Sequence, residues 1–133
     1  MEVLFVCDHN EGRSQIAEAF FKRFSKKNIC ASAGINAHSA GMKLKDSNPR
    51  VVVFMKELDF DLSSCIVKQL DKEAIAKADL IIVMSDNMLP DFLSNSKKVR
   101  IWDVKDFASD LEAYRVLRDK IKHNVELLVK EIG

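Results

Sequence analysis

The residues with the clearest chemical potential lie in one short polar segment near the N-terminus, CDHNEGRS at positions 7–14. Cys7 supplies a sulfur that attacks electrophilic centres once it is ionised to the thiolate. Arg13 carries a planar guanidinium that can hold two oxygen atoms of one oxyanion. A thiolate beneath a bound oxyanion is arranged to attack phosphorus or arsenic in line. The segment therefore predicts nucleophilic chemistry on a phosphate-like group.

The other residues of the segment fit a cradle for that anion. Backbone amides that point inward at the start of a helix bind oxyanions. Asn10 tolerates a left-handed backbone, Gly12 accepts conformations closed to other residues, and Ser14 can donate a hydrogen bond to the sulfur. We expect the whole loop to surround the oxyanion: Asp8, His9, Asn10, Glu11, Gly12, Arg13 and Ser14.

Other interpretations of the segment stay open. Asp8 and Glu11 place acidic side chains beside an anion, so we expect them to point outward, to weaken the field and to tune specificity. His9 either lines the site or makes a structural hydrogen bond. Cys7 could also be a buried cysteine that ends a strand, which is a common place for this residue. The Cys-x5-Arg spacing alone is a weak signal, and its context adds most of the weight.

That context is an alternation of strands and helices. Continuous apolar runs predict buried strands over 3–6 and 80–84, and shorter strands are expected over 29–33 and 99–102. Helices are expected over 13–26, from Asn48-Pro49 to Met55, over 71–77 and 87–93, and from an N-cap at Ser109 to the end; 35–47 is expected to be a long loop. This alternation predicts an α/β fold with a parallel sheet, and ligands bind such sheets at the carboxyl ends of the strands.

Composition sets the broad class. The chain has 133 residues, 47% hydrophobic and 31% charged, and a net charge of +1, which predicts a single domain over 1–133 without a nucleic-acid or membrane partner. The apolar runs are too short for a signal peptide or a membrane span. Three cysteines without a CxxC pair argue against disulfides and a zinc site, so we expect a cytoplasmic protein with no metal. Because the chain has no Walker or dinucleotide glycine motif, no cofactor is expected.

The motifs together resemble one enzyme family along nearly the whole chain. VLFVCDHNEGRSQIAEAF, the SAG at 32–34, the NPR at 48–50 and the strand ADLIIVM are similar to the low-molecular-weight protein tyrosine phosphatase family, which includes the thioredoxin-type arsenate reductases. The resemblance implies a three-layer α/β sandwich, with a four-stranded parallel sheet in the order 2-1-3-4 and helices on both faces. It also implies that Cys7 is the nucleophile, that Arg13 and the loop amides bind the oxyanion, and that Ser14 supports the thiolate.

The family also places a general acid on a late loop that faces the nucleophile. The matching segment is IWDVKDFAS, where Asp106 takes the position of the acid and Phe107 replaces the usual proline. An acid is needed because an alkoxide or phenolate leaves poorly without a proton. Asp103 and Asp110 are nearby alternatives for the acid, and Asp106 could instead be a solvated loop or capping residue.

Phosphatase and reductase chemistry are both compatible with these residues. Reductases of this family that use an internal relay carry further cysteines after the central strand, where this chain reads Met84-Ser85-Asp86. Cys30 is expected to pack in the core, and Cys65 is either a loop residue or a resolving thiol. An external thiol, from glutaredoxin or thioredoxin, could instead regenerate Cys7. The loop pattern His-Asn-x-Gly-Arg-Ser-Gln is closer to the reductase branch.

Three functions follow, in order of preference. The first is a phosphatase that forms a phosphocysteine on Cys7 and acts on a phosphorylated protein or a small phosphate ester. The second is an arsenate reductase that uses Cys7 with a second thiol. The third is a phosphate- or phosphopeptide-binding module without turnover, suggested by Asp8, Glu11 and Phe107. The loop at 35–47 and the region around Phe107 are expected to set the substrate.

Overall fold

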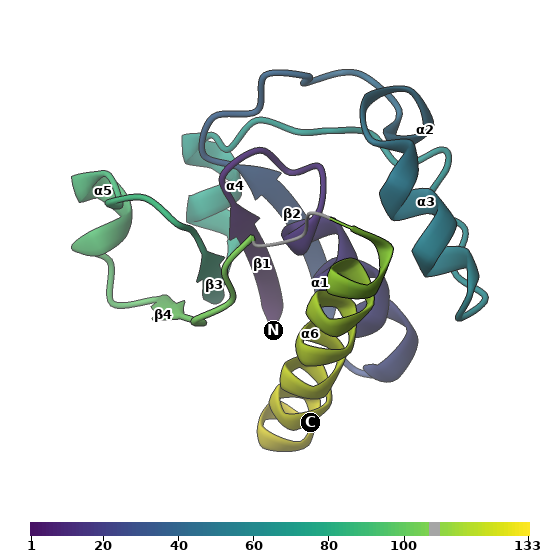
Figure 1. Cartoon of the computed structure of the whole chain (residues 1–133). Helices are drawn as coiled ribbons and strands as arrows, with labels where there is room; N and C mark the ends of the chain where they lie inside the picture. Colours follow the sequence, from purple (N-terminus) through teal and green to yellow (C-terminus); the bar gives the residue numbers. More distant parts are fainter. Residues whose placement is uncertain (107–109) are drawn as a thin grey trace.

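The computed structural model describes residues 1–106 and 110–133 (Figure 1). Strands and helices alternate along the chain, as the sequence predicts. Their bounds are β1 Glu2–Cys7, α1 Arg13–Phe24, β2 Ile29–Gly34, α2 Leu44–Ser47, α3 Pro49–Lys56, α4 Lys72–Lys77, β3 Leu80–Met84, α5 Asp91–Ser94, β4 Val99–Ile101 and α6 Leu111–Ile132.

The strands form one four-stranded sheet in the order β2-β1-β3-β4. Every neighbouring pair is parallel, so the predicted sheet and its strand order are confirmed. β1 and β3 occupy the centre, and their apolar runs are buried because helices cover the sheet on both sides. Cys7, the last residue of β1, pairs with Gly34 of β2 and Met84 of β3. The nucleophile candidate thus lies at the carboxyl edge of the sheet.

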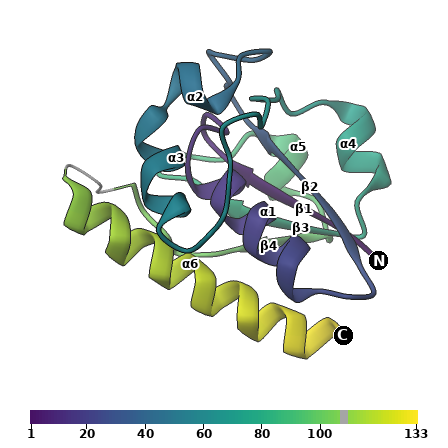
Figure 2. The same cartoon turned by 90° about the vertical axis from the view of Figure 1, so that its right-hand side faces the viewer.

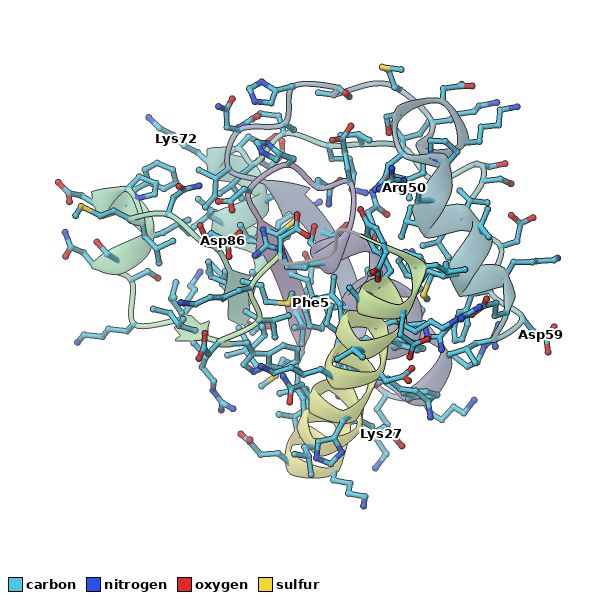
Figure 3. All side chains as sticks on the ribbon, viewed as in Figure 1. Phe5, Lys27, Arg50, Asp59, Lys72 and Asp86 are labelled. Atoms are coloured by element: carbon cyan, nitrogen blue, oxygen red, sulfur yellow. The ribbon has the colours of Figure 1, made fainter. Side chains whose placement is uncertain are left out.

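Successive side chains of β1 point to opposite faces of the sheet, so the core has two layers. Val3, Phe5 and Cys7 share a cluster with residues of α1, α3 and α6 on one face. Leu4 and Val6 share a second cluster on the other face, against which α4 packs and to which α5 contributes Leu93. Figure 1 shows these layers, with α1 and α6 on one side of the sheet and α4 and α5 on the other. In Figure 3 the labelled Phe5 lies at the centre, between the sheet and α6.

The long C-terminal helix lies beside α1 in both views (Figures 1 and 2). An ion-pair cluster joins it to the end of α3: Glu57 accepts hydrogen bonds from Arg115 at 2.7 Å and from Arg118 at 2.8 Å. These hydrogen bonds hold the pKa of Glu57 at about 2, well below its ordinary value. The cluster therefore links the two helices that flank the carboxyl edge of the sheet.

Several predicted boundaries are wrong. The last helix begins at Leu111, and its N-cap is Asp110, whose side chain accepts from the Ala113 amide; Ser109 lies outside the described residues. Asp110 caps the helix because its carboxylate accepts a hydrogen bond from a free amide of the first turn. The expected loop at 35–47 contains the short helix α2. The helix expected over 87–93 begins only at Asp91, after the extended Pro90. None of the described helices has the length and apolarity needed to cross a membrane.

Candidate active site

The loop over 8–12 leaves β1 and enters α1 at the carboxyl edge of the sheet. Gly12 is the N-cap residue of α1, and its carbonyl accepts the first helical hydrogen bond from the Ile16 amide at 2.9 Å. Its φ of −147° is negative, so the left-handed residue of this loop is Asn10, with a φ of 61°. The expectation for Asn10 is therefore confirmed, and the first amides of α1 have no partner inside the helix, as at any helix start.

Asn10 holds the loop in place from inside. It is fully buried, and its side-chain NH₂ donates to Ser14 Oγ at 2.7 Å and to Ser32 Oγ at 3.0 Å. Its side-chain oxygen accepts from Gln15 Nε2 at 2.9 Å and from the Lys68 amide at 2.8 Å. Because every polar group of this side chain has a partner, the loop is fixed before any ligand binds.

Two hydrogen-bonding groups of the loop and of α1 meet at the sulfur of Cys7. The sulfur lies 2.9 Å from Ser14 Oγ and accepts from the Asn10 amide at 3.3 Å. Ser14 Oγ already accepts from the Asn10 side chain, so its own hydrogen is free to point at the sulfur. Two donors therefore converge on the sulfur of Cys7, a residue that is almost fully buried. Hydrogen bonds of this kind stabilise a thiolate, so the arrangement suits the nucleophilic role expected of Cys7.

Gly34 lets the loop pass close above the end of β2. A Cβ atom at this position would lie 2.7 Å from the backbone carbon of His9 and 2.8 Å from the Asn10 nitrogen. Two hydrogen bonds hold the following strand end to the loop: the Ile35 amide donates to the Cys7 carbonyl at 2.9 Å, and the Asn36 amide to the Asp8 carbonyl at 2.8 Å. The glycine of the SAG motif is thus needed for close backbone approach.

Arg13 is buried and already has protein partners. Its Nη2 lies 3.1 Å from Asp8, and its Nη1 donates to the Asp86 carboxylate at 3.2 Å and to the Val104 carbonyl at 3.0 Å. The expectation that Asp8 points outward is wrong, because its side chain turns inward and pairs with Arg13. Burial works to raise the pKa of Asp8, but hydrogen bonds from Ser85 and the Asp86 amide, with Arg13, outweigh it and lower the pKa. Asp8 is therefore a charged support beneath the guanidinium.

Asp86 is a residue of the candidate site that the sequence analysis did not identify. Besides Arg13, its carboxylate accepts from the Asp106 amide at 3.3 and 3.4 Å, so it joins the arginine to the segment of the expected acid. Figure 3 labels Asp86 near the carboxyl ends of the central strands. The signal was present in its position, two residues after β3, where parallel sheets bind their ligands.

A cavity of about 280 Å³ opens beside Cys7, and both Cys7 and Asp106 line it. Of the alternative acids, Asp103 does not line it, and Asp110 is used as the N-cap of α6. Phe107 lies outside the described residues. The wall also includes residues that sequence reasoning missed, contributed by the end of α2, the start of α3 and α6. The full lining is Cys7, His9, Glu11, Gly12, Arg13, Ser47, Asn48, Asp106, Tyr114 and Leu117.

His9 combines the two roles left open for it. Its ring lines the cavity, and its Nδ1 lies 2.8 Å from the Asn36 carbonyl oxygen. The ring also packs against His38, with 4.8 Å between the two centroids. Within the described ranges, no three His, Cys, Asp or Glu side chains are grouped to hold a metal ion.

The other two cysteines lie away from this cavity. Cys65 lines a separate cavity with Glu18, Lys22 and Phe60, and burial raises the pKa of its thiol. Burial together with the nearby Glu18 raises the pKa of Cys30 to about 12. The structure thus does not bring Cys65 into the cavity of Cys7, and it keeps both thiols protonated at neutral pH.

Comparison with known proteins agrees with this geometry. The model of the family described as low molecular weight phosphotyrosine protein phosphatase matches residues 2–133. Curated relatives include the arsenate reductase of Staphylococcus aureus strain N315, 30% identical over 93% of this chain and 92% of the relative. Another is arsenate reductase 1 of Bacillus cereus, 31% identical over 90% and 87%.

Solved structures add both activities of the predicted family. A low molecular weight protein tyrosine phosphatase from T. tengcongensis superposes with a TM-score of 0.84 at 27% identity, covering 99% of each chain. An arsenate reductase in the phosphate-binding state reaches a TM-score of 0.82 at 26% identity, covering 99% of this chain and 98% of the other. Solved structures named for each of these two activities therefore match this chain with similar TM-scores and sequence identities.

Proposed function

This chain belongs to the low molecular weight phosphotyrosine protein phosphatase family, and from that premise we propose that it hydrolyses phosphate monoesters through a phosphocysteine intermediate. Its membership makes it a cysteine-dependent enzyme of the phosphatase or arsenate reductase type. One observation carries the choice of phosphatase. Cys7 shares its cavity with a carboxylic acid, Asp106, whereas neither of the other two cysteines lines that cavity.

In the first step the Cys7 thiolate attacks phosphorus and displaces the leaving group. The S–P bond forms as the P–O bond breaks, and Asp106 gives its proton to the departing oxygen. The free amides at the start of α1 and the remaining N–H groups of Arg13 stabilise the charge on the equatorial oxygens. Asp8 and Asp86 hold the guanidinium in place, so it need not reorganise during the reaction.

In the second step water replaces sulfur on phosphorus. Asp106, now a carboxylate, takes a proton from the water molecule, the O–P bond forms and the S–P bond breaks. The leaving thiolate returns to the hydrogen bonds of Ser14 Oγ and the Asn10 amide. This cycle needs neither a metal nor a redox partner, and its products are the alcohol and inorganic phosphate.

Arsenate reduction is the second candidate function, favoured by the curated relatives that are named arsenate reductases. In this scheme Cys7 displaces water from arsenate to form an S–As bond, and a second thiol attacks the Cys7 sulfur. Arsenite leaves with two electrons, and the two sulfurs form a disulfide that a third thiol reduces. Cys65 lines another cavity, so the second thiol would come from outside, from a small thiol, glutaredoxin or thioredoxin.

Parallel assays on one preparation test these functions. We expect turnover of p-nitrophenyl phosphate that disappears in Cys7→Ser and that falls at least about tenfold in Asp106→Asn. Cys30→Ser is the matched control and keeps full turnover, since this thiol lies outside the cavity. Arsenate-dependent thiol oxidation with glutaredoxin or thioredoxin, without ester hydrolysis, would assign the reductase. Phosphate binding with neither reaction and no phosphocysteine would assign a binding module.

A further inference from the structure

The segment that carries Asp106 runs over 102–106, directly after β4 (Figure 1). Two contacts hold it from the side of the catalytic cavity: the Val104 carbonyl accepts from Arg13 at 3.0 Å, and the Asp106 amide donates to Asp86 at 3.3 Å. Val104 is buried in the core, whereas Asp106 is exposed. The position of the acid therefore depends on how the backbone around Val104 is oriented.

A third contact reaches this segment from α6. Lys120 Nζ donates to the backbone carbonyl of Asp103 at 2.7 Å, and in the part of the chain that the structure describes no other side chain of α6 hydrogen-bonds to 102–106. The carbonyls of Asp103 and Val104 belong to successive peptide planes, and their partners, Lys120 and Arg13, lie on different helices. Because peptide planes are rigid, two carbonyls held in this way fix the backbone that leads to Asp106.

The helix presents Lys120 from a firm position beside an unfilled space. Leu117 and Ile121, which lie three residues before it and one residue after it, are buried in the core. A cavity of about 380 Å³ lies between β4 and α6, and Lys120, Trp102 and Asp103 contribute to its lining. Because a cavity supplies no van der Waals contacts to the segment on that side, packing cannot replace the Lys120 hydrogen bond there.

A second contact between the same two regions offers a comparison. Arg100 of β4 pairs with Glu131 of α6 at 2.6 Å, and both side chains line the same cavity. Among the residues that the structure describes, neither side chain hydrogen-bonds to 102–106. This ion pair ties β4 to α6 without holding the segment of the acid, so its removal reports on a general loosening of α6.

We infer that Lys120 is a positioning residue for the general acid, because its ammonium group holds the 102–106 segment with Asp106 in the cavity of Cys7. This inference rests on the proposed phosphatase function, in which Asp106 protonates the leaving group. Lys120 does not line that cavity, so it acts through the backbone of Asp103 alone. Loss of the contact lowers the fraction of time that the acid spends in place and leaves binding of the oxyanion unchanged.

The first test measures kcat/KM of the full chain for a series of aryl phosphates whose leaving phenols differ in basicity. In Lys120→Met, which keeps an unbranched side chain but removes the donor, we expect a loss of about threefold for phenyl phosphate, since one hydrogen bond contributes modestly. The loss should vanish for the most acidic phenols, which leave without a proton. Inhibition by inorganic phosphate should stay unchanged. Lys120→Arg should restore wild-type kinetics, and Glu131→Gln is the matched control that keeps them.

A second test does not depend on turnover. Amide hydrogen exchange, followed by mass spectrometry on peptides that contain 102–106, should be faster in Lys120→Met than in the wild type, Lys120→Arg or Glu131→Gln. If the wild type hydrolyses none of the aryl phosphates, the proposed phosphatase function fails, and the exchange result alone decides whether Lys120 holds the segment. Equal losses across the phenol series, wild-type kinetics in Lys120→Met, or unchanged exchange in that variant overturns the inference.

Discussion

Removal of the Asp86 carboxylate should weaken proton transfer to the leaving group more than binding of the oxyanion. In Asp86→Ala the Asp106 amide loses its two acceptor contacts at 3.3 and 3.4 Å, so the segment that carries the acid is no longer held to Arg13. Arg13 itself keeps Asp8 and the Val104 carbonyl. The acid should therefore occupy its working position for a smaller fraction of the time.

The magnitude follows from the contacts and their exposure. Hydrogen bonds to a charged group contribute about 1.5–3 kcal/mol when buried. The Asp86 side chain is 37% exposed, so solvent screening reduces this contribution. We take about 1 kcal/mol, which corresponds to about a fivefold change in the population of the docked segment.

The assay uses leaving groups that differ in their need for a proton. For phenyl phosphate, whose leaving group is about as basic as a tyrosine side chain, kcat/KM should fall about fivefold. For 2,4-dinitrophenyl phosphate it should change less than about twofold, because that phenolate leaves without protonation. Asp103→Ala, an exposed carboxylate of the same segment that does not line the cavity, should change neither. Equal losses on both substrates, or no loss on either, would refute the role of Asp86 in positioning the acid.

Three further predictions follow from the same contacts. Glu57→Gln should lower the melting temperature at pH 6. The difference in melting temperature from the wild type should shrink as the pH falls from about 4.5 towards 2, because the pKa of Glu57 is about 2 in the folded protein and 4.5 ordinarily. A difference in melting temperature that does not depend on pH would contradict this. Gly34→Ala should cost about 1–3 kcal/mol of stability and most of the activity, since the new methyl group meets the His9 and Asn10 backbone; wild-type melting and turnover would show that the loop does not depend on close approach. Iodoacetamide at pH 7.5 should leave Cys30 unmodified in the folded protein, as peptide mass spectrometry can check, because its pKa is about 12; rapid modification of Cys30 would disprove the raised pKa.

Some features of the site depend on neighbours in the chain, and the sequence predicted these well. The buried run of β1, the loop that follows it and the start of α1 are continuous in sequence, so Cys7, Arg13 and Ser14 could be grouped from their spacing together with the strand before them and the helix after them. The left-handed Asn10 follows from its own backbone preference. The parallel sheet likewise follows from the alternation of apolar runs and helical patterns.

Boundaries were less predictable because they depend on which capping group reaches a free amide. Ser109 and Asp110 are both good capping residues, and only the packed helix shows that Asp110 accepts from Ala113. The segment at 35–47 is polar and reads as a loop, yet Lys43 bridges Ile66 and the next residues form α2. That contact joins residues far apart in sequence, so no local pattern signals it.

By itself, the sequence predicted the fold class and the loop between β1 and α1 that carries Cys7 and Arg13, because both depend on residue types at short, regular spacing. The tertiary structure alone decided what surrounds them. Arg13 meets Asp86 and Val104 across separations of 73 and 91 residues, and Asp8 turns inward to the same guanidinium. The packing of distant segments also leaves the buried Ser47 hydroxyl without a hydrogen-bond partner among the described residues, and it places Cys65 in a different cavity from Cys7. Such contacts are set by the order of the strands and the volume of the core, and local spacing carries no record of them.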